Sequence, residues 1–285
     1  MSLGPKLHPD WLIPQWPAPE NVRALCTTRA AGTSQVPYDS MNLGDHVGDV
    51  VSHVAQNRVL LHDAMNARPV FLKQVHGTRV VAHGPHVEGP LLPPLQADAC
   101  ITRHPGVACT IMVADCLPVL LTNRQGTLVG AAHAGWRGLA GEIGTGVGGS
   151  GDADTGKAAS GVLEAICQQF YQQFHPTAAD DILVWLGPCI GPLKFEVGND
   201  VRDVFVAHDS AAEAMFKLLG AGKWLADLAG LARLRLRAMG VNKIYGNDGS
   251  PAWCTVSNAS RFFSHRRDSV TLGGSGRMAA SIWLG

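Results

Sequence analysis

The chain has 285 residues, of which 46% are hydrophobic and 16% are charged, and its 23 Lys and Arg residues balance 23 Asp and Glu residues. A chain with no net charge lacks the basic surface of a general nucleic-acid binder, and no segment supplies the roughly 20 continuous apolar residues of a membrane span. The seven cysteines are irregularly spaced and include no CxxC, which favours a reducing compartment over a disulfide framework. We expect a cytoplasmic protein with one large mixed α/β core.

The first third of the chain predicts a short strand, a helix and two further strands separated by loops. Residues 1–21 contain several prolines and no continuous apolar run, which is not typical of a signal peptide, and we interpret them as an N-terminal extension. Gly and Pro residues indicate a surface loop at 84–95. The predicted elements are a strand at 22–27, a helix at 50–65 and strands at 71–77 and 79–83.

The centre of the chain carries three apolar runs, at 107–113, 117–122 and 127–134, separated by short polar breaks. These runs predict strands of a buried sheet, with Cys116 and His133 at or beside strand ends. The tract at 144–160 is rich in Gly, Ser, Ala and Asp and has no apolar surface to bury, so a flexible insertion is predicted there.

The last part of the chain alternates helices and strands irregularly, without an internal repeat. Gly240 is a suitable C-cap for the helix that precedes it. The predicted elements are helices at 161–174, 199–208 and 224–239 and strands at 182–187, 241–246 and 278–284. Together with the earlier elements they predict one mixed α/β domain at residues 22–285.

His76, Cys116 and His133 are candidate ligands of a catalytic zinc ion. Such a site takes three protein ligands from His, Cys and carboxylate and leaves a fourth position open, which requires these three residues to converge. Their spacing is not a local metal motif. Taken singly, a Cys in an apolar segment is more often a small core residue, and a His beside a Gly turn is more often a hydrogen-bonded structural residue.

Long stretches of the chain closely resemble one family. They are KQVHG, ADCLPVLL, AAHAGWRG, LGPCIGP with KFEVG, RFFSHRRD and GRMAASIWL, joined by TTRAAG, YDSMNLGDHVGD and QNR near the N-terminus. The family is the YfiH/laccase-domain (polyphenol oxidase, DUF152) family of purine nucleoside phosphorylases, and the resemblance covers about residues 22–284.

The resemblance implies a fold, a cofactor and an activity. The implied fold is a four-layer α/β/β/α sandwich with mixed sheets. The family's zinc ligands fall on His76, Cys116 and His133, and the implied Zn²⁺ enzyme acts on a purine nucleoside and phosphate. The implied reactions are phosphorolysis of adenosine, inosine, guanosine or methylthioadenosine and hydrolytic deamination of adenosine.

Asp115 is a candidate for moving protons during deamination, which needs a hydroxide nucleophile and a carboxylate or imidazole beside it. Successive strand residues point to opposite faces, so Asp115 and Cys116 share a pocket only if the strand breaks there, as Pro118 suggests. A carboxylate that only caps a turn is an equally good interpretation.

Phosphorolysis also needs a cradle for phosphate, built from cations or backbone N–H groups. Arg137 follows His133 by four residues at a predicted strand-to-helix junction, and Arg29 and the Arg266–Arg267 pair are further candidates. Each of these arginines more commonly serves as a surface or ion-pair residue. The catalytic residues we expect are Cys116, Asp115 and Arg137, and the substrate-binding residues are Arg29, Asn42, His46, Gln74 and Arg266.

The chain departs from the family pattern at three places. The insertion at 144–160 lengthens the connection after HAGWRG. The segment GNDGSPAWCTVSN keeps Cys254 but lacks the Arg expected before it, and His265 stands where a Tyr is expected. The last two changes leave substrate contacts open, and none affects the three proposed ligands.

Three other functions are compatible with parts of the pattern. Cys116 and His133 could form the dyad of a thiol hydrolase or amidase acting on a peptide-like or cell-wall precursor, in which His76 would be redundant. A copper oxidase needs many His ligands, and the absence of any HxH pair among the 12 histidines argues against a trinuclear copper cluster. A structural zinc site needs a fourth ligand, for which His46 or His104 would serve. The dominant reaction and the preferred base stay open, and we expect a monomer.

Overall fold

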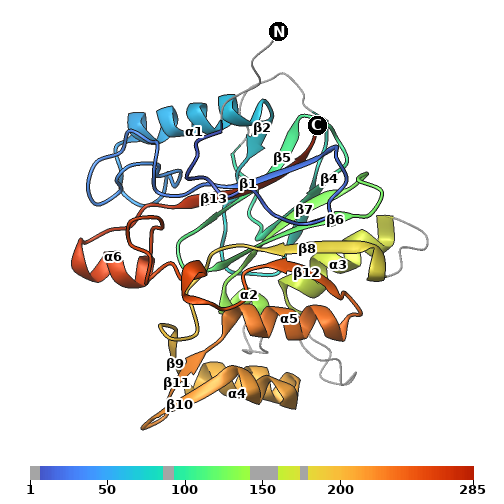
Figure 1. Cartoon of the computed structure of the whole chain (residues 1–285), viewed down its shortest axis with the longest axis vertical. Coiled ribbons are helices and arrows are strands. Elements are labelled where there is room, and N and C mark those ends of the chain that lie inside the picture. Colours follow the sequence, from blue (N-terminus) through green and yellow to red (C-terminus); the bar gives the residue numbers. More distant parts are fainter. Residues whose placement is uncertain (1–6, 86–92, 142–159, 174–178) are drawn as a thin grey trace.

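Two β-sheets packed face to face form the centre of the molecule (Figure 1). The computed structural model describes residues 7–85, 93–141, 160–173 and 179–285. The first sheet has the strand order β1 (Val22–Cys26), β13 (Met278–Leu284), β5 (Val107–Val113) and β2 (Arg68–Val70). The second has the order β12 (Lys243–Gly246), β8 (Ile182–Leu186), β6 (Leu117–Asn123), β7 (Val129–Ala134), β4 (Ala99–Thr102) and β3 (Val80–His83). Both sheets mix parallel and antiparallel pairs.

Helices cover the outer face of each sheet. Helix α1 (Val51–Met65) packs on the first sheet, and its buried Leu61 and Met65 share a core with Ala108 of β5. The helices over the second sheet are α2 (Trp136–Ala140), α3 (Val162–Gln173) and α5 (Leu228–Ala238). These layers confirm the expected four-layer α/β/β/α sandwich.

Alternating strand residues explain how one strand contributes to separate cores on its two faces. In β13, Ala280 and Ile282 point into the core between the sheets, whereas Ala279 and Trp283 pack toward α1. The central strands β5, β6 and β7 are buried along their whole length. They are therefore apolar on both faces, which is why their sequences read as continuous apolar runs.

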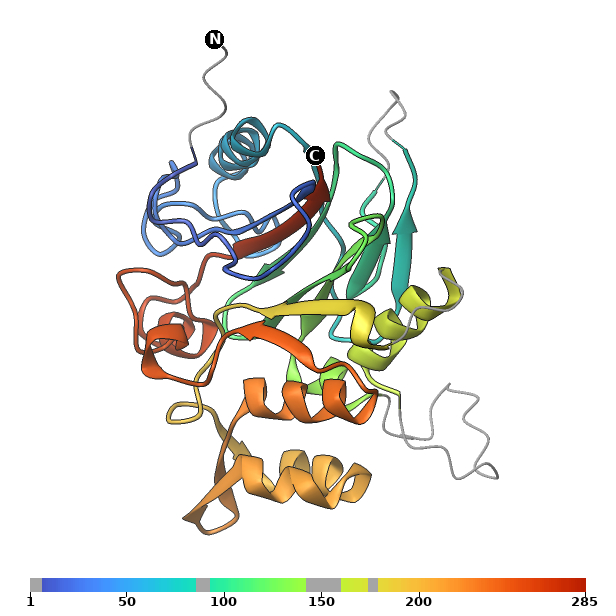
Figure 2. The same cartoon turned by 45° about the vertical axis from the view of Figure 1, so that its right-hand side comes forward.

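A small third sheet extends from one end of the sandwich. Figures 1 and 2 both show it at the bottom of the molecule with one helix packed beside it. Its elements are β9 (Glu196–Gly198), β10 (Phe216–Gly220), β11 (Lys223–Ala226) and α4 (Asn199–His208). The last helix, α6 (His265–Thr271), lies between this end and the first sheet.

Two predicted elements are wrong. The segment 71–77 is not a strand, because it forms only an isolated bridge between Lys73 and Gln96. The helix predicted at 224–239 begins as strand β11, and α5 starts only after Asp227, whose carboxylate caps it by accepting a hydrogen bond from the N–H of Gly230 (2.8 Å). Strands β2 and β4, helix α6 and the small third sheet are not predicted by the sequence pattern.

The other predicted elements agree with the structure to within a few residues. Gly240, predicted as a C-cap, follows α5 with φ 82°, the left-handed conformation that glycine adopts easily. The insertion predicted at 144–160 lies, apart from its last residue, outside the described residues.

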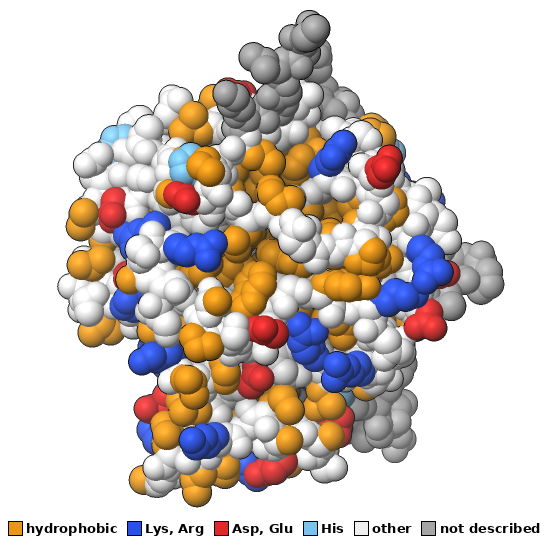
Figure 3. All heavy atoms as spheres, in the orientation of Figure 1, with side chains coloured by type: hydrophobic (Ala, Val, Ile, Leu, Met, Phe, Trp, Pro, Cys, Tyr) orange, Lys and Arg blue, Asp and Glu red, His pale blue; other side chains and the backbone are white. Residues whose placement is uncertain are grey.

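The visible face (Figure 3) carries charges of both signs, and the described helices are too short or too polar to span a membrane. On the face seen in Figure 3, Lys and Arg side chains are interspersed with Asp and Glu side chains and do not form a block of one sign. Of the helices in the described ranges, none is long and apolar enough to cross a membrane.

Candidate metal centre

The β6–β7 ladder places two of the predicted ligands together. Cys116 immediately precedes β6 and His133 is the penultimate residue of β7, where the register pairs Pro118 with His133. Because strand residues alternate between faces, Cys116 and His133 both lie on the face turned toward the first sheet. The convergence that the sequence required is therefore a result of strand register.

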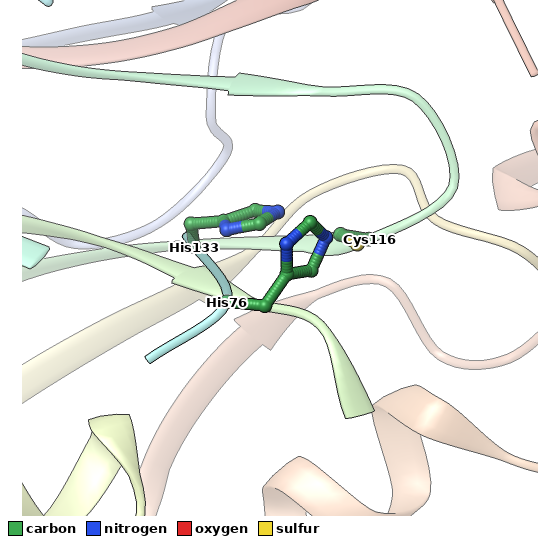
Figure 4. Close-up of side chains that lie close together, drawn as sticks. All are labelled: His76, Cys116 and His133. Atoms are coloured by element: carbon green, nitrogen blue, oxygen red, sulfur yellow. The ribbon is translucent and has the colours of Figure 1, made fainter. Parts of the chain in front are cut away.

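His76 reaches the same point from the segment between β2 and β3. Its backbone is left-handed, with φ 62°. The ligand atoms of His76, Cys116 and His133 lie within 4.8 Å of one another. Figure 4 shows the three side chains pointing toward one another.

The donor set fits a catalytic metal ion. Two imidazoles and a thiol suit Zn²⁺, and His133 is 3% exposed whereas His76 is open to solvent. Among the described residues these three form the one such group of His, Cys, Asp or Glu side chains, so neither His46 nor His104 joins it as a fourth ligand. Three protein ligands leave a coordination position for water or substrate.

The buried Asp98 side chain orients both His76 and His133 through hydrogen bonds. Its buried carboxylate accepts hydrogen bonds from the backbone N–H groups of Val75 (3.2 Å), His76 (2.8 Å) and Gly77 (2.7 Å). It also lies 2.9 Å from Nδ1 of His133. Burial favours the neutral acid, but the bonds from His133 and the backbone outweigh it and hold the pKa of Asp98 below its ordinary value. The ionised carboxylate makes His133 Nδ1 the donor, which leaves Nε2 free to bind a metal.

Contacts within the site shift the pKa values of Cys116 and His133. Burial raises the pKa of the Cys116 thiol, but His133 and His76 outweigh burial and lower it to about 6. Burial lowers the pKa of His133, and Cys116 and Asp98 raise it to about 9. Cys116 is therefore a thiolate near neutral pH, as a metal ligand must be.

Gly135 permits the close packing of these ligands. It follows β7 and precedes α2. A Cβ atom at this position would lie 2.9 Å from Cys116 Sγ and 3.0 Å from His76 Cδ2. Any larger residue would displace two of the three ligands, which gives a physical reason for glycine in the HAGW stretch.

The three ligands lie in a cavity of about 460 Å³ whose lining comes from both halves of the sandwich. This volume is in the range of small-molecule sites. The Arg277 wall, on the side of the first sheet, consists of His46, Gln74, Met112, Ala114 and Arg277. The Trp136 wall consists of residues from α2, α5, α6 and the segment between β8 and β9: Trp136, Arg137, Ile190, Phe195, Leu228 and Arg266. Asp115 and His265 complete the lining.

Asp115 shares the cavity with Cys116 because the chain turns sharply between β5 and β6. Asp115 has φ 88°, so the strand breaks at this residue itself and Pro118 lies within β6. Its carboxylate accepts hydrogen bonds from Thr255 Oγ1 and from the backbone N–H of Arg266, both at 2.6 Å. The Asp115 carboxylate therefore lines the cavity, as a proton-transfer residue must, and it also caps a neighbouring backbone N–H group, as the second interpretation expected.

Four of the other predicted site residues line the cavity and two do not. Arg137, His46, Gln74 and Arg266 are in the lining. Gln74 is clamped to β5, because its side chain both donates to the carbonyl and accepts from the N–H of Met112 (2.8 and 2.7 Å).

Arg29 and Asn42 lie outside the lining and support its loops. Arg29 forms an ion pair with Asp39 at 2.9 Å and donates to the carbonyl of Ala259. The Asn42 side chain accepts hydrogen bonds from the N–H groups of Gly44 (3.0 Å) and Arg277 (2.8 Å). Asn42 therefore positions the backbone of Arg277 without lining the cavity itself.

Sequence reasoning missed several residues of the site. Asp98 was detectable as a lone carboxylate among the small apolar residues of ADACIT. Arg277 lies in GRMAASIWL, a stretch that carries the family resemblance. Trp136 and Phe195 had no chemical signal of their own, because an aromatic residue in such a context is usually part of the core.

Comparisons with known proteins agree over nearly the whole chain. The family model described as multi-copper polyphenol oxidoreductase laccase matches residues 23–149 and 151–285. A protein of Pseudomonas aeruginosa named purine nucleoside phosphorylase is 46% identical, over 96% of this chain and 98% of its own length. The purine nucleoside phosphorylase YfiH of Escherichia coli is 44% identical, with the same coverage of 96% and 98%.

Solved structures show the same fold. The crystal structure of a Neisseria meningitidis protein of the DUF152 family matches with a TM-score of 0.80 and 40% identity, over 96% of this chain and 99% of that one. The structure of YlmD from Geobacillus stearothermophilus matches with a TM-score of 0.74 and 29% identity, over 93% and 92%.

Proposed function

Since the chain belongs to the family described as multi-copper polyphenol oxidoreductase laccase, we propose that it is a zinc-dependent purine nucleoside enzyme. Its reactions would be phosphorolysis of adenosine, inosine, guanosine or methylthioadenosine and hydrolytic deamination of adenosine. The names of its close relatives support the phosphorylase activity. We further propose that it acts as a cytoplasmic monomer.

One observation carries the proposal: three ligand side chains within 4.8 Å of one another line a cavity that is large enough for a small molecule. His76, Cys116 and His133 would hold the zinc ion. Once bound, zinc supplies a Lewis acid that can polarise a substrate or activate water at neutral pH.

The other lining residues supply binding and proton transfer. The arginines in the lining supply positive charge that phosphate needs, and the aromatic residues of the Trp136 wall would take the flat base. Asp115 would move a proton during deamination. Its bonds to Thr255 and to the backbone of Arg266 hold its carboxylate in place beside Cys116.

A thiol hydrolase is the second candidate function. The pair formed by the Cys116 thiolate and a protonated His133, oriented by Asp98, has the arrangement of a nucleophile, a base and an orienting group. The position of His76 argues for the metal, because a dyad does not need a third ligand.

Copper oxidation is less well supported. A multicopper oxidase needs several metal centres. In the described ranges, His76, Cys116 and His133 make up the one candidate group.

The proposed reactions are separated by their products. Purified protein of known zinc content is incubated with adenosine, with and without phosphate, and the products are resolved. Adenine formed only with phosphate supports phosphorolysis, and inosine formed without phosphate supports deamination. Zinc-loaded protein that leaves every tested purine nucleoside unchanged would refute the nucleoside function, and amide substrates would then be tested.

A further inference from the structure

The two walls of the cavity differ in chemistry, and we infer that they fix the orientation of the substrates. Phosphate binds to Arg277, and the purine base binds against Trp136 and Phe195 on the opposite wall. This inference rests on the proposed phosphorolysis and deepens it. It assigns the phosphate to an arginine outside the HAGWRG and SHRRD stretches.

Arg277 has a guanidinium group that is held in place without a carboxylate partner. Its Nη1 donates to the carbonyls of Ser275 (2.8 Å) and Gly276 (3.1 Å), and Asn42 holds its backbone N–H. Across the described residues, no carboxylate lies within ion-pair distance of Arg277, and Nε and Nη2 have no hydrogen-bond acceptor. Arg277 is half-buried, and the negative charges that act on it, Cys116 and Asp115, do not contact it directly. An anionic ligand in the cavity would give the free side of its guanidinium a direct charge-assisted partner.

The surroundings of Arg277 are shaped for this side chain. A Cβ atom on Gly44 would lie only 2.8 Å from Arg277 Cγ, so glycine at this position leaves room for it. His46 follows two residues later and lines the same wall. Burial and the charge of Arg277 lower the pKa of His46, and a neutral imidazole can still donate one hydrogen bond to a phosphate oxygen.

The arginines of the Trp136 wall are placed differently, because both lie over aromatic rings. The guanidinium of Arg137 lies 4.4 Å from the ring centre of Trp136. That of Arg266 lies 5.8 Å from the ring centre of Phe195 and donates to the carbonyl of Glu196 (3.2 Å). Stacked guanidinium groups extend a flat surface, and a flat, largely apolar surface suits a purine ring.

In this arrangement the sugar is held at the metal ligands, which line the same cavity. Cys116 belongs to the turn that joins β5 of the first sheet to β6 of the second. In the reaction, a phosphate oxygen forms a bond to C1′ of the ribose as the bond from C1′ to the base nitrogen breaks. The base leaves with that electron pair and takes up the proton that the phosphate loses. Opposite walls for phosphate and base place the attacking and leaving atoms on opposite sides of C1′.

The test compares Arg277→Gln with Arg266→Gln, a matched change on the other wall. We expect Arg277→Gln to raise the KM for phosphate about tenfold or more, because charge-assisted hydrogen bonds are lost, while the KM for the nucleoside stays within about twofold. For Arg266→Gln we expect the larger change in the KM for the nucleoside. Arg277→Lys should recover part of the phosphate affinity, because it keeps the charge and loses the planar fork. An unchanged phosphate KM in Arg277→Gln, or a rise only in its nucleoside KM, overturns the inference.

Direct binding separates this inference from the proposed function. Inorganic phosphate alone is titrated calorimetrically into the zinc-loaded wild type, Arg277→Gln and Arg277→Lys, after thermal unfolding has shown each to be folded. Loss of binding in Arg277→Gln with partial recovery in Arg277→Lys supports the phosphate site, even if no nucleoside is converted. Equal binding by all three proteins refutes it, even if phosphorolysis is observed.

Discussion

At Asp98 a single buried carboxylate accepts hydrogen bonds from three consecutive backbone N–H groups and from the ring of His133. The first set holds His76 in its left-handed conformation, and the last fixes the tautomer of His133. Two ligands that are 57 residues apart, at positions 76 and 133, thus depend on one side chain.

Asp98→Asn tests this dependence. The amide cannot accept from all four donors, so both histidines lose part of their orientation. We expect zinc affinity to fall about 10–100-fold, as for other partners of metal-ligating histidines, and the measurement is competition against a chromogenic chelator. Asp115→Asn is the matched control, because Asp115 contacts Thr255 and Arg266 and neither histidine. Equal zinc affinity in wild type and Asp98→Asn would contradict the role given to Asp98.

Gly135→Ala tests the close packing of the ligands. The added methyl group would lie 2.9 Å from Cys116 Sγ and 3.0 Å from His76 Cδ2, so these side chains must move apart. We expect the variant to fold and to bind less than about a tenth of the wild-type zinc at equal free zinc, consistent with a displaced ligand. The bound metal is counted by elemental analysis after gel filtration. Full zinc occupancy would show that the ligands tolerate the displacement.

The sequence revealed the site residues whose type and neighbours indicate a metal ligand, and it did not reveal those that act through contacts across the fold. Cys116 and His133 were placed at strand ends by the apolar runs beside them. Asp98 and Arg277 were missed because their importance comes from contacts across the fold, Asp98 with His133 and Arg277 with Asn42. Arg29 and Asn42 had the right residue types for a site and instead bind neighbouring loops.

Among the elements, α2, α3 and α5 are joined through the buried side chain of Arg235. Arg235 of α5 donates to Glu164 of α3 at 2.7 Å and also to the carbonyl of Ala140 at the end of α2 (3.4 Å). The Arg235 side chain is only 4% exposed. This pair fixes the helices that cover the second sheet next to the metal centre.

Arg235→Met would leave the Glu164 carboxylate partly buried without its partner. We expect the free energy of unfolding to fall by about 3–5 kcal/mol, measured by urea denaturation. The pair Glu164→Gln with Arg235→Met should recover part of the loss, because no unpaired charge remains. A decrease of less than about 1 kcal/mol in the single variant would place the pair with weak surface ion pairs.

Helices and strands were predictable where the periodicity of the sequence agreed with the burial of its residues. They were not predictable where a tertiary contact determined the backbone conformation. Phe71, Leu72 and Val75 have the pattern of a strand. The backbone leaves the extended conformation at His76, where the N–H group donates to the Asp98 carboxylate. Trp224 and Leu225 fit a helix, yet they pair with β9 and β10. The capping residue Asp227 was the local signal that marked the true start of α5.

At the scale of the whole molecule, the two sheets share one core. Cys109 and Ile111 of the first sheet pack with Leu120 and Ala131 of the second. Neither sheet can bury its inner face alone, so the described parts of residues 22–285 should unfold together, as a single domain would.

Calorimetry of the metal-depleted protein tests this prediction. We expect one transition whose calorimetric and van't Hoff enthalpies agree, together with a monomer on gel filtration. Two separated transitions would show that the small third sheet and its helix, or another part of the chain, unfolds independently.

Return of activity on adding zinc to the metal-depleted protein tests the proposed metal centre. Metal-depleted protein is titrated with Zn²⁺ while adenine formation from adenosine and phosphate is followed, in parallel with His76→Ala and Cys116→Ala. If the three ligands form a zinc centre, activity rises in proportion to bound zinc and reaches its maximum at about one ion per chain, the capacity of one three-ligand site. Neither variant is then expected to recover activity. Full activity in the metal-depleted protein, or in His76→Ala, would contradict a zinc centre and assign the chemistry to the Cys116–His133 pair.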